Sequence, residues 1–296
     1  MEDLIKKIKL QKIPVFFVSP HLDDAALSCG ELIRKLGTLT SITVINVFTR
    51  AGNGRQTVIA KKAVKASKFL SALDLYIERV SEDKKALESI NAKVINLNYI
   101  DAPWRKIKKP SIIRKTLSIL VPEFIHVYPT YRFHISNGKI AKEDNELITK
   151  INKNLKEIIS KNSIVFCPFG IGNHVDHLLT KKAVEKCFDP IYWMDQPYFQ
   201  KKKPSKCHCE EHHDSGRRSQ VPDGTWRSNL YQQRDCFAPI VARNDKKPEV
   251  EFSRFIFKVN VKSKRQLISF YRTQINLLFP GGRIPELSEI FITKDK

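Results

Sequence analysis

The sequence contains no long apolar segment. No run approaches the roughly 18 apolar residues that a membrane-spanning helix needs, so we expect no membrane span. Residues 1–12, MEDLIKKIKLQK, are mixed in charge and lack the apolar core and small-residue cleavage site of a signal peptide. A cytoplasmic location is therefore expected. Short-period repeats and low-complexity tracts are also absent from the sequence, which argues against solenoid and fibrous classes.

Acidic residues are scarce, and the cysteines form no regular framework. The chain has 31 Asp and Glu against 52 Lys and Arg, a formal net charge of +21. The cations are spread along the chain, with the densest clusters at 61–62, 106–109 and 201–203. This spread favours a solvated basic surface over a polyanion site, so no nucleic-acid partner is expected. The six cysteines are unevenly spaced, which in a cytosolic chain predicts reduced thiols.

Short apolar segments alternate with helical patterns. The segments that read as buried strands, rich in Val, Ile and Phe, are 15–18, 41–48, 94–97 and 164–168. Helical spacing follows the first two, at 25–36 and 58–73. The predicted fold class is α/β: a Rossmann-like, mainly parallel sheet with helices on both faces, plus a C-terminal extension.

The later part of the chain is less regular. Residues 106–161 are predicted to be mostly helical, residues 191–194 to form a fifth strand and residues 252–261 a further strand. Residues 264–279 predict one amphipathic helix that ends at Pro280.

We divide the chain into a catalytic α/β domain at residues 1–199, a polar insertion at 200–248, and a C-terminal strand and helix at 249–296 that complete the domain. The insertion contains a Cys/His cluster from Cys207 to His213. Its residue types suit zinc, but two residues normally separate paired zinc cysteines. The sequence leaves a second metal site open and favours a surface loop.

Two loops that follow predicted strands carry histidines and carboxylates. They hold His21, Asp23 and Asp24 after strand 15–18, and His174, Asp176 and His177 after strand 164–168. In an open α/β sheet, ligands bind beyond the carboxyl ends of the strands. Both groups of residues are therefore expected to lie at a ligand-binding or catalytic site.

These residue types suit a catalytic zinc site, which typically has three N or O ligands and one position for water. His21 and Asp24 are three residues apart at a helix start, so one turn can bring both to one point. His177 can supply the third ligand if the two strands are neighbours. Asp23 is then left as a general base for a metal-activated water.

His174 is predicted to act as an acid or an oxyanion stabiliser, with Asp176 as its orienting partner. The alternative is structural, because Asp23 or Asp24 could cap the helix and His174 could be an ordinary loop histidine. The joint occurrence of both motifs favours metal-dependent hydrolysis.

At these residues the sequence resembles the PIG-L or LmbE-like N-deacetylases, zinc hydrolases that remove acetyl groups from N-acetylglucosamine-type sugars. The family's two motifs stand here as His21-Leu22-Asp23-Asp24 and His174-Val175-Asp176-His177. Looser likenesses lie at 101–105 and 271–274.

The resemblance implies an LmbE-like catalytic domain with one Zn²⁺ held by His21, Asp24 and His177, with Asp23 as base and His174 assisting. Leu22 replaces the usual proline and Ala25 a common glutamate, which leaves the ligands intact and the subfamily open.

The expected partner is a small N-acetylated amino sugar, such as a GlcNAc-containing precursor of a secondary metabolite, aminoglycoside or thiol. Candidate substrate-binding residues are Asn53, Arg55, Asp101, Trp104 and Arg105. Trp104 could stack on a sugar ring or pack in the core, and Asn53 and Arg55 could bind substrate or face solvent.

Three alternatives stay open: another divalent metal, a zinc amidohydrolase with a different amide substrate, and an inactive scaffold that binds polyanions. A homo-oligomer is also left open.

Overall fold

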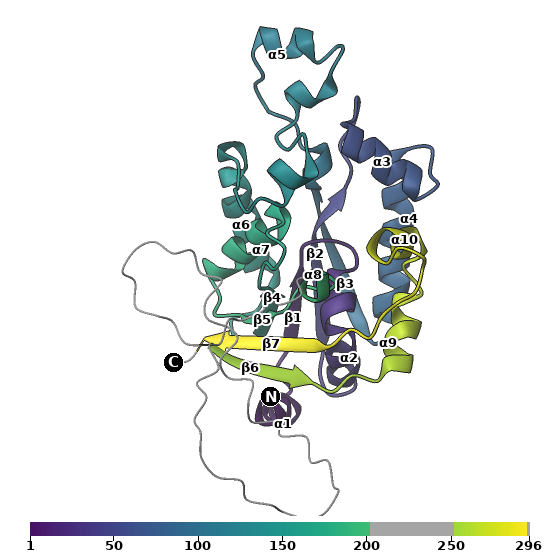
Figure 1. Cartoon of the computed structure of the whole chain (residues 1–296). Coiled ribbons are helices and arrows are strands. Elements are labelled where there is room, and N and C mark those ends of the chain that lie inside the picture. Colours follow the sequence, from purple (N-terminus) through teal and green to yellow (C-terminus); the bar gives the residue numbers. More distant parts are fainter. Residues whose placement is uncertain (202–251, 295–296) are drawn as a thin grey trace, which may run out of the picture. The chain divides into compact units, whose positions relative to one another are not determined.

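Five parallel strands form the centre of the sheet. The computed structural model describes residues 1–201 and 252–294, which belong to one unit (Figure 1). In this part of the chain the sheet has seven strands in the order β3-β2-β1-β4-β5-β7-β6. They are β1 (Val15–Ser19), β2 (Ile42–Arg50), β3 (Ala92–Ile100), β4 (Ile164–Pro168), β5 (Ile191–Trp193), β6 (Phe252–Phe257) and β7 (Glu289–Lys294). The strands β1 to β5 pair in parallel, whereas β7 is antiparallel to β5 and to β6.

The connections between the strands are mostly helical. The α-helices are α1 (Glu2–Gln11), α2 (Asp24–Gly37), α3 (Val58–Ala66), α4 (Ala72–Glu88), α5 (Ile112–Leu117), α6 (Asn145–Ile158), α7 (Val175–Glu185), α8 (Tyr198–Lys201), α9 (Val261–Ile268) and α10 (Arg272–Leu278). Short 3₁₀ or π turns are η1 (Ala102–Trp104), η2 (Pro122–Ile125), η3 (Tyr131–Ile135) and η4 (Lys142–Asp144). No helix among the described residues is both long and apolar enough to cross a membrane.

Both faces of the sheet are covered by apolar side chains, as the buried strand β1 requires. Val15 and Phe17 point into a cluster that includes residues of α1, α2, α4 and α9. Phe16 and Val18 point the other way, into a cluster with α6 and α7. The two groups of helices lie on opposite sides of the sheet in Figure 1. The predicted mainly parallel sheet with helices on both faces, extended at its C-terminus, is confirmed.

A buried carboxylate of the C-terminal elements, itself part of an ion pair, accepts hydrogen bonds from α2. Glu289 on β7 accepts hydrogen bonds from the backbone amides of Glu31 (2.7 Å) and Leu32 (2.9 Å). It also pairs with Lys264 of α9, and both side chains are almost completely buried. Glu31 and Leu32 lie in the middle of α2, so Glu289 anchors the helix that begins at the candidate ligand Asp24.

The predicted single helix at 264–279 is wrong. The chain leaves the helical path at Tyr271, between α9 and α10, where ψ is 56°. There the Tyr271 hydroxyl donates to buried Asp83 (2.8 Å), and the backbone amide of Thr273 donates to Glu82 (3.0 Å). These contacts with α4 stabilise the break more than a continuous helix would be stabilised by its apolar spacing. The sequence of residues 264–279 does not reveal contacts with a distant helix.

Two other helical expectations differ from the structure. Residues 106–161 contain only the short α5 and then α6, with turns between them. The predicted helix at 58–73 ends at Ala66, and α4 follows from Ala72. The insertion assigned to 200–248, including the Cys207 to His213 cluster, lies almost wholly outside the described residues.

Replacing Glu289 with Gln should destabilise the protein by about 3–5 kcal/mol, because Lys264 would keep a buried charge without its partner. Chemical denaturation measures the change in the free energy of unfolding. The matched control is Glu146→Gln, which removes an exposed carboxylate paired with Lys108 and should leave that free energy unchanged. Equal effects of the two substitutions would contradict a special role for the buried pair.

Candidate active site

The parallel pairing of β1 with β4 brings the two histidine-bearing loops together. Val15, Phe16 and Phe17 lie opposite Ile164, Val165 and Phe166, so both strands end at the same edge of the sheet. The loop after β1 enters α2 at Asp24, and the loop after β4 enters α7 at Val175. The condition set for a shared site, that the two strands be neighbours, is met.

The three predicted metal ligands converge on one carboxylate oxygen. Asp24 Oδ2 lies 3.0 Å from His21 Nδ1 and 3.3 Å from His177 Nε2. Ligand atoms that each lie about 2.0–2.2 Å from a tetrahedral ion are about 3.4 Å apart, so each of these two separations is compatible with a shared cation. His177 Nε2 is fully buried and faces this carboxylate oxygen.

His177 is held by a carboxylate that the sequence analysis missed. Asp195 Oδ1 lies 2.6 Å from His177 Nδ1, and the other oxygen accepts hydrogen bonds from the amides of Gly170 and Ile171, each at 2.8 Å. A carboxylate on the far nitrogen fixes the orientation of a metal-binding imidazole. Its position in the sequence could have indicated this role, because Asp195 follows β5 and so lies at the same edge of the sheet as the two loops.

The charges in this cluster balance one another. Burial alone raises the pKa of Asp24, but the charge of His177 and the hydrogen bond with His21 outweigh it, so the net pKa is lowered. Burial lowers the pKa of His177, but the charge of Asp24 and the hydrogen bond with Asp195 outweigh it and raise the pKa to about 10. Without a metal, His177 is therefore a cation between two carboxylates.

Asp23 lies beside this group and is also buried, with 6% of its surface exposed. Burial and the charge of Asp24 raise the pKa of Asp23 well above its usual range, against the opposing charge of His21. A carboxylate with a raised pKa accepts a proton more readily than an ordinary aspartate.

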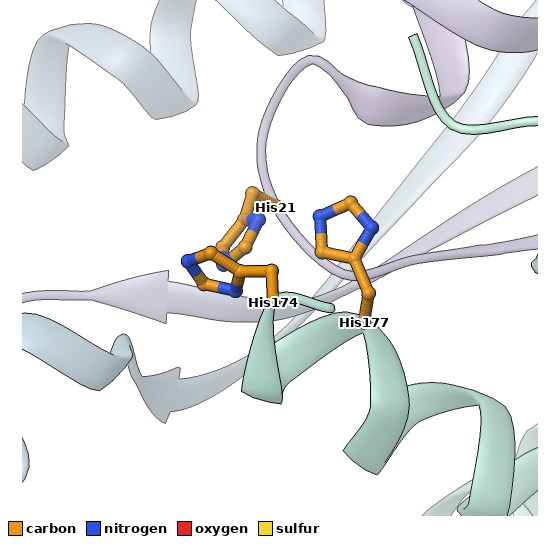
Figure 2. A group of neighbouring side chains, drawn as sticks. All are labelled: His21, His174 and His177. Carbon is orange, nitrogen blue, oxygen red and sulfur yellow. The ribbon is translucent and has the colours of Figure 1, made fainter. Parts of the chain in front are cut away.

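His174 lies next to the other two histidines, as Figure 2 shows. Ligand atoms of His21, His174 and His177 lie within 4.8 Å of one another. The ring of His174 caps α7, because Nδ1 accepts the amide of Asp176 (3.3 Å). Burial and the charge of His21 lower its pKa well below the usual value, so the ring is neutral and carries its proton on Nε2.

The Asp176 carboxylate differs from its predicted role of orienting His174. It faces Arg105 Nη2 (2.5 Å), His21 Nε2 (3.2 Å) and the amide of Ala102 (3.0 Å). The charge of Arg105 and the contact with His21 outweigh burial and lower its pKa. Asp176 therefore braces His21, and it contacts His174 through its own backbone.

The side chain of Arg105 is buried and forms ion pairs within the protein. Its guanidinium pairs with Asp176 and with Asp144 (2.9 Å) and is only 6% exposed. This argues against the predicted direct substrate contact, because the guanidinium also lies over the rings of Phe48 (4.9 Å) and Tyr128 (5.1 Å). The sequence showed no partner for the charge, since Asp144 belongs to a distant turn.

The remaining substrate-binding expectations divide. Asp101 does face the site, with Oδ1 3.6 Å from His21 Nε2. Trp104 packs edge-on against Tyr76 and is 3% exposed, which agrees with the core-packing alternative and not with sugar stacking. Asn53 and Arg55 are exposed on the loop after β2. Arg55 lines a cavity of about 390 Å³ with Gly54, Gln56, Lys61, Leu120 and Pro122, none of which is a predicted site residue.

Two tyrosines that the sequence analysis did not select adjoin the histidines. The Tyr131 ring lies 6.2 Å from that of His174, and the Tyr198 ring lies 5.6 Å from that of His177. Tyr131 is more than one-third exposed, so it offers an aromatic surface at the mouth of the site that Trp104 does not.

Comparison with known proteins places this arrangement in context. The model of the family described as "PIG-L: GlcNAc-PI de-N-acetylase" matches residues 16–188, more than half of the chain. No match was found among curated protein sequences.

Several solved structures have a similar fold. The zinc-inhibited form of a teicoplanin deacetylase has a TM-score of 0.63 at 18% identity and covers 96% of this chain and 99% of its own. A deacetylase–teicoplanin complex has a TM-score of 0.61 at 18% identity, with the same coverage. A deacetylase of an antimicrobial pseudoaglycone has a TM-score of 0.57 at 18% identity and covers 95% of this chain and 97% of its own.

Replacing Asp195 with Asn should weaken zinc binding about 10- to 100-fold, because His177 loses the carboxylate that orients it. Titration calorimetry measures the affinity, and a thermal melt checks that the variant folds. The matched control is Asp189→Asn, which changes an exposed carboxylate nearby and should bind zinc as the parent does. Parental affinity in the Asp195 variant would exclude this supporting role.

Proposed function

Because the chain belongs to the GlcNAc-PI de-N-acetylase family, we propose that it is a metal-dependent hydrolase that removes the acetyl group from an N-acetylated amino sugar. The observation that carries the proposal is the convergence of His21, Asp24 and His177 on one point, with a buried carboxylate, Asp23, beside them. This combination provides a cation site and a base in one crevice.

The proposed ligands are His21, Asp24 and His177, with Zn²⁺ as the expected ion. The donor set fits, because it is made of nitrogen and carboxylate oxygen, and the buried His177 Nε2 faces the carboxylate of Asp24. When bound, the ion would polarise the amide carbonyl and lower the pKa of a water molecule at the site.

Asp23 is proposed to take the proton from the attacking water. Its raised pKa suits this role, since a general base works best when its pKa lies near the operating pH. The same carboxyl group can then deliver the proton to the leaving amine. Asp24, whose pKa is lowered, stays ionised throughout and suits a ligand instead.

His174 is proposed to stabilise the oxyanion as a neutral hydrogen-bond donor. Its Nδ1 accepts a backbone amide and its pKa is lowered, so a proton on Nε2 is free to be donated. Of the two roles open from the sequence, a neutral donor fits this electrostatic setting better than an acid.

The substrate class rests on the family description and on the character of the crevice. The family description names a GlcNAc derivative, and the similar solved structures include a teicoplanin deacetylase. Tyr131, at the mouth of the site, offers a ring on which a pyranose could stack. Candidate substrates are therefore free and conjugated N-acetylglucosamine, with other amides as the comparison that separates a deacetylase from a different amidohydrolase.

Asp23→Asn should lower the rate of acetate release about 10²- to 10⁴-fold while zinc binding persists, because the base is lost and the proposed ligands remain. His177→Ala should lose both activity and zinc. Acetate release is assayed on N-acetylglucosamine conjugates, with the metal content of each variant measured in parallel. Asp74→Asn, an exposed change at the start of α4, is the control. Unchanged turnover in a zinc-loaded Asp23 variant would rule out this base.

Metal affinity should increase with pH. With a pKa of about 10, His177 is protonated at pH 7, and a metal can bind only after that proton leaves. The apparent affinity should therefore rise about tenfold per pH unit for each proton displaced. Calorimetry at pH 6.5–8 in buffers of different ionisation enthalpy measures the protons released.

Removal of the metal with a chelator should abolish acetate release, and readdition should restore it. Because a deacetylase of similar fold is described in a zinc-inhibited form, Co²⁺, Fe²⁺ and Zn²⁺ should each be titrated from sub-stoichiometric amounts upward. Affinity that is independent of pH, or activity that survives complete metal removal, would contradict the proposed centre.

A further inference from the structure

Residues 106–125, which we call the apical tip, stand apart from the sheet. They include α5 and η2, and in Figure 1 α5 lies well away from the helices that cover the sheet. The tip has an antiparallel neck: Ile107 donates to the carbonyl of Ile125 (2.8 Å), and Val127 donates to that of Arg105 (2.9 Å). The segment after α5 is also held, because Arg55 donates to the carbonyl of Ile119 and the amide of Val58 donates to Glu123 (2.8 Å), while α5 itself projects.

The apex exposes aliphatic side chains. Ile112, Ile113 and Leu120 are 81%, 72% and 86% exposed, and no residue of α5 is buried. Further exposed apolar residues of the tip are Leu117, Ile119, Val121 and Phe124. So many contiguous exposed apolar residues usually mark an interaction site in a water-soluble domain.

The same segment is strongly cationic. Residues 106–125 contain five Lys or Arg and one acidic residue, Glu123, which accepts the amide of Val58. Lys108 pairs with Glu146, whereas Lys109, Arg114 and Lys115 are exposed beside the aliphatic residues. Aliphatic groups at an apex with cations around them match an anionic lipid surface, where acyl chains meet phosphate headgroups.

We propose that the apical tip docks this protein on the surface of a bilayer that contains anionic lipids. Ile112, Ile113 and Leu120 enter the boundary between headgroups and acyl chains, and Lys109, Arg114 and Lys115 contact lipid phosphates. Long cationic side chains do this readily, because their stems lie along apolar surface while their charges stay in water. A nucleic acid is a poorer match, since base stacking needs aromatic side chains and the three most exposed ones here are aliphatic.

The position of the tip relative to the candidate active site makes docking useful. One end of the neck is Arg105, which pairs with Asp176 at the site, and the other leads to Tyr131 beside His174. A cavity of about 390 Å³ between the tip and the loop after β2 is lined by Arg55, Lys61, Leu120 and Pro122 among others. Its mixture of cationic and apolar lining suits a lipid headgroup next to its chain.

Co-sedimentation of the full chain with vesicles tests the proposal. Vesicles of phosphatidylcholine alone are compared with vesicles containing 30 mol% phosphatidylglycerol (about one lipid in three) at about 0.1 M salt, where surface charges act over roughly 10 Å. We expect at least tenfold stronger partitioning into the anionic vesicles. The effect should weaken as salt is raised.

Two triple variants locate the contact. Ile112→Ser, Ile113→Ser and Leu120→Ser together should reduce partitioning at least tenfold. Lys109→Gln, Arg114→Gln and Lys115→Gln together should reduce it by roughly fivefold per cation. The controls are Leu70→Ser with Leu73→Ser, which alter exposed aliphatic residues elsewhere, and Lys7→Gln, Lys9→Gln and Lys65→Gln, which remove the same charge elsewhere.

The readouts keep docking separate from catalysis. Release of acetate from a water-soluble substrate should be unchanged in both tip variants, so failure of the proposed activity would not affect the binding result. In a Leu120→Trp variant the emission should shift to the blue when anionic vesicles are added, because the indole leaves water. Light scattering without lipid should give the same mass for the parent and the aliphatic variant.

Four results would overturn the proposal. They are the absence of vesicle binding by the parent, equal losses in tip and control variants, binding that ignores the aliphatic substitutions, and a lipid-free oligomer that the aliphatic substitutions dissociate. The last result would assign the apical tip to a second copy of the chain.

Discussion

The parallel pairing of β1 with β4 is the contact on which the candidate site depends. Each strand is buried on both faces, so its register is set by apolar packing far from any catalytic group. Since both strands point the same way, the loops that follow them open at one edge. His21 and His177 lie 156 positions apart in the chain but share the oxygen of Asp24. The chemistry is thus a consequence of strand order.

Burial of so many charged groups is tolerable because they are paired. His177 lies between Asp24 and Asp195, and His21 between Asp24 and Asp176. Arg105 offsets the negative charge of Asp176 from the side away from the histidines. In a medium of low polarity, removing one partner leaves another charge exposed to the full cost of burial. The cluster therefore behaves as a unit, and its geometry is fixed before any ligand enters.

The C-terminal elements stabilise the site from behind without entering it. Gln274 of α10 donates to the carbonyl of Leu22, inside the first motif, and Tyr271 bonds Asp83 of α4. Glu289 holds the middle of α2. These contacts join segments more than 180 residues apart and restrain the loop between β1 and α2. The apical tip differs, because α5 has no buried residue, and besides the neck the tip is held by contacts of Ile119 with Arg55 and of Glu123 with Val58.

The sequence by itself determined the α/β class and the two polar loops, because strand burial and helix starts are local patterns and His and Asp residues are visible in them. It also predicted that the loops with the candidate ligands would meet at one edge of the sheet, because loops after neighbouring parallel strands open there. Only the tertiary structure decided which carboxylate pairs with which histidine or arginine. The partners of Asp195, Asp144 and Asp176 lie far from them in the sequence. Trp104 and Arg105 are buried in the protein, whereas their sequence context had suggested contact with the substrate. Side-chain direction in a loop depends on packing from distant elements, and the sequence pattern carries no record of that packing.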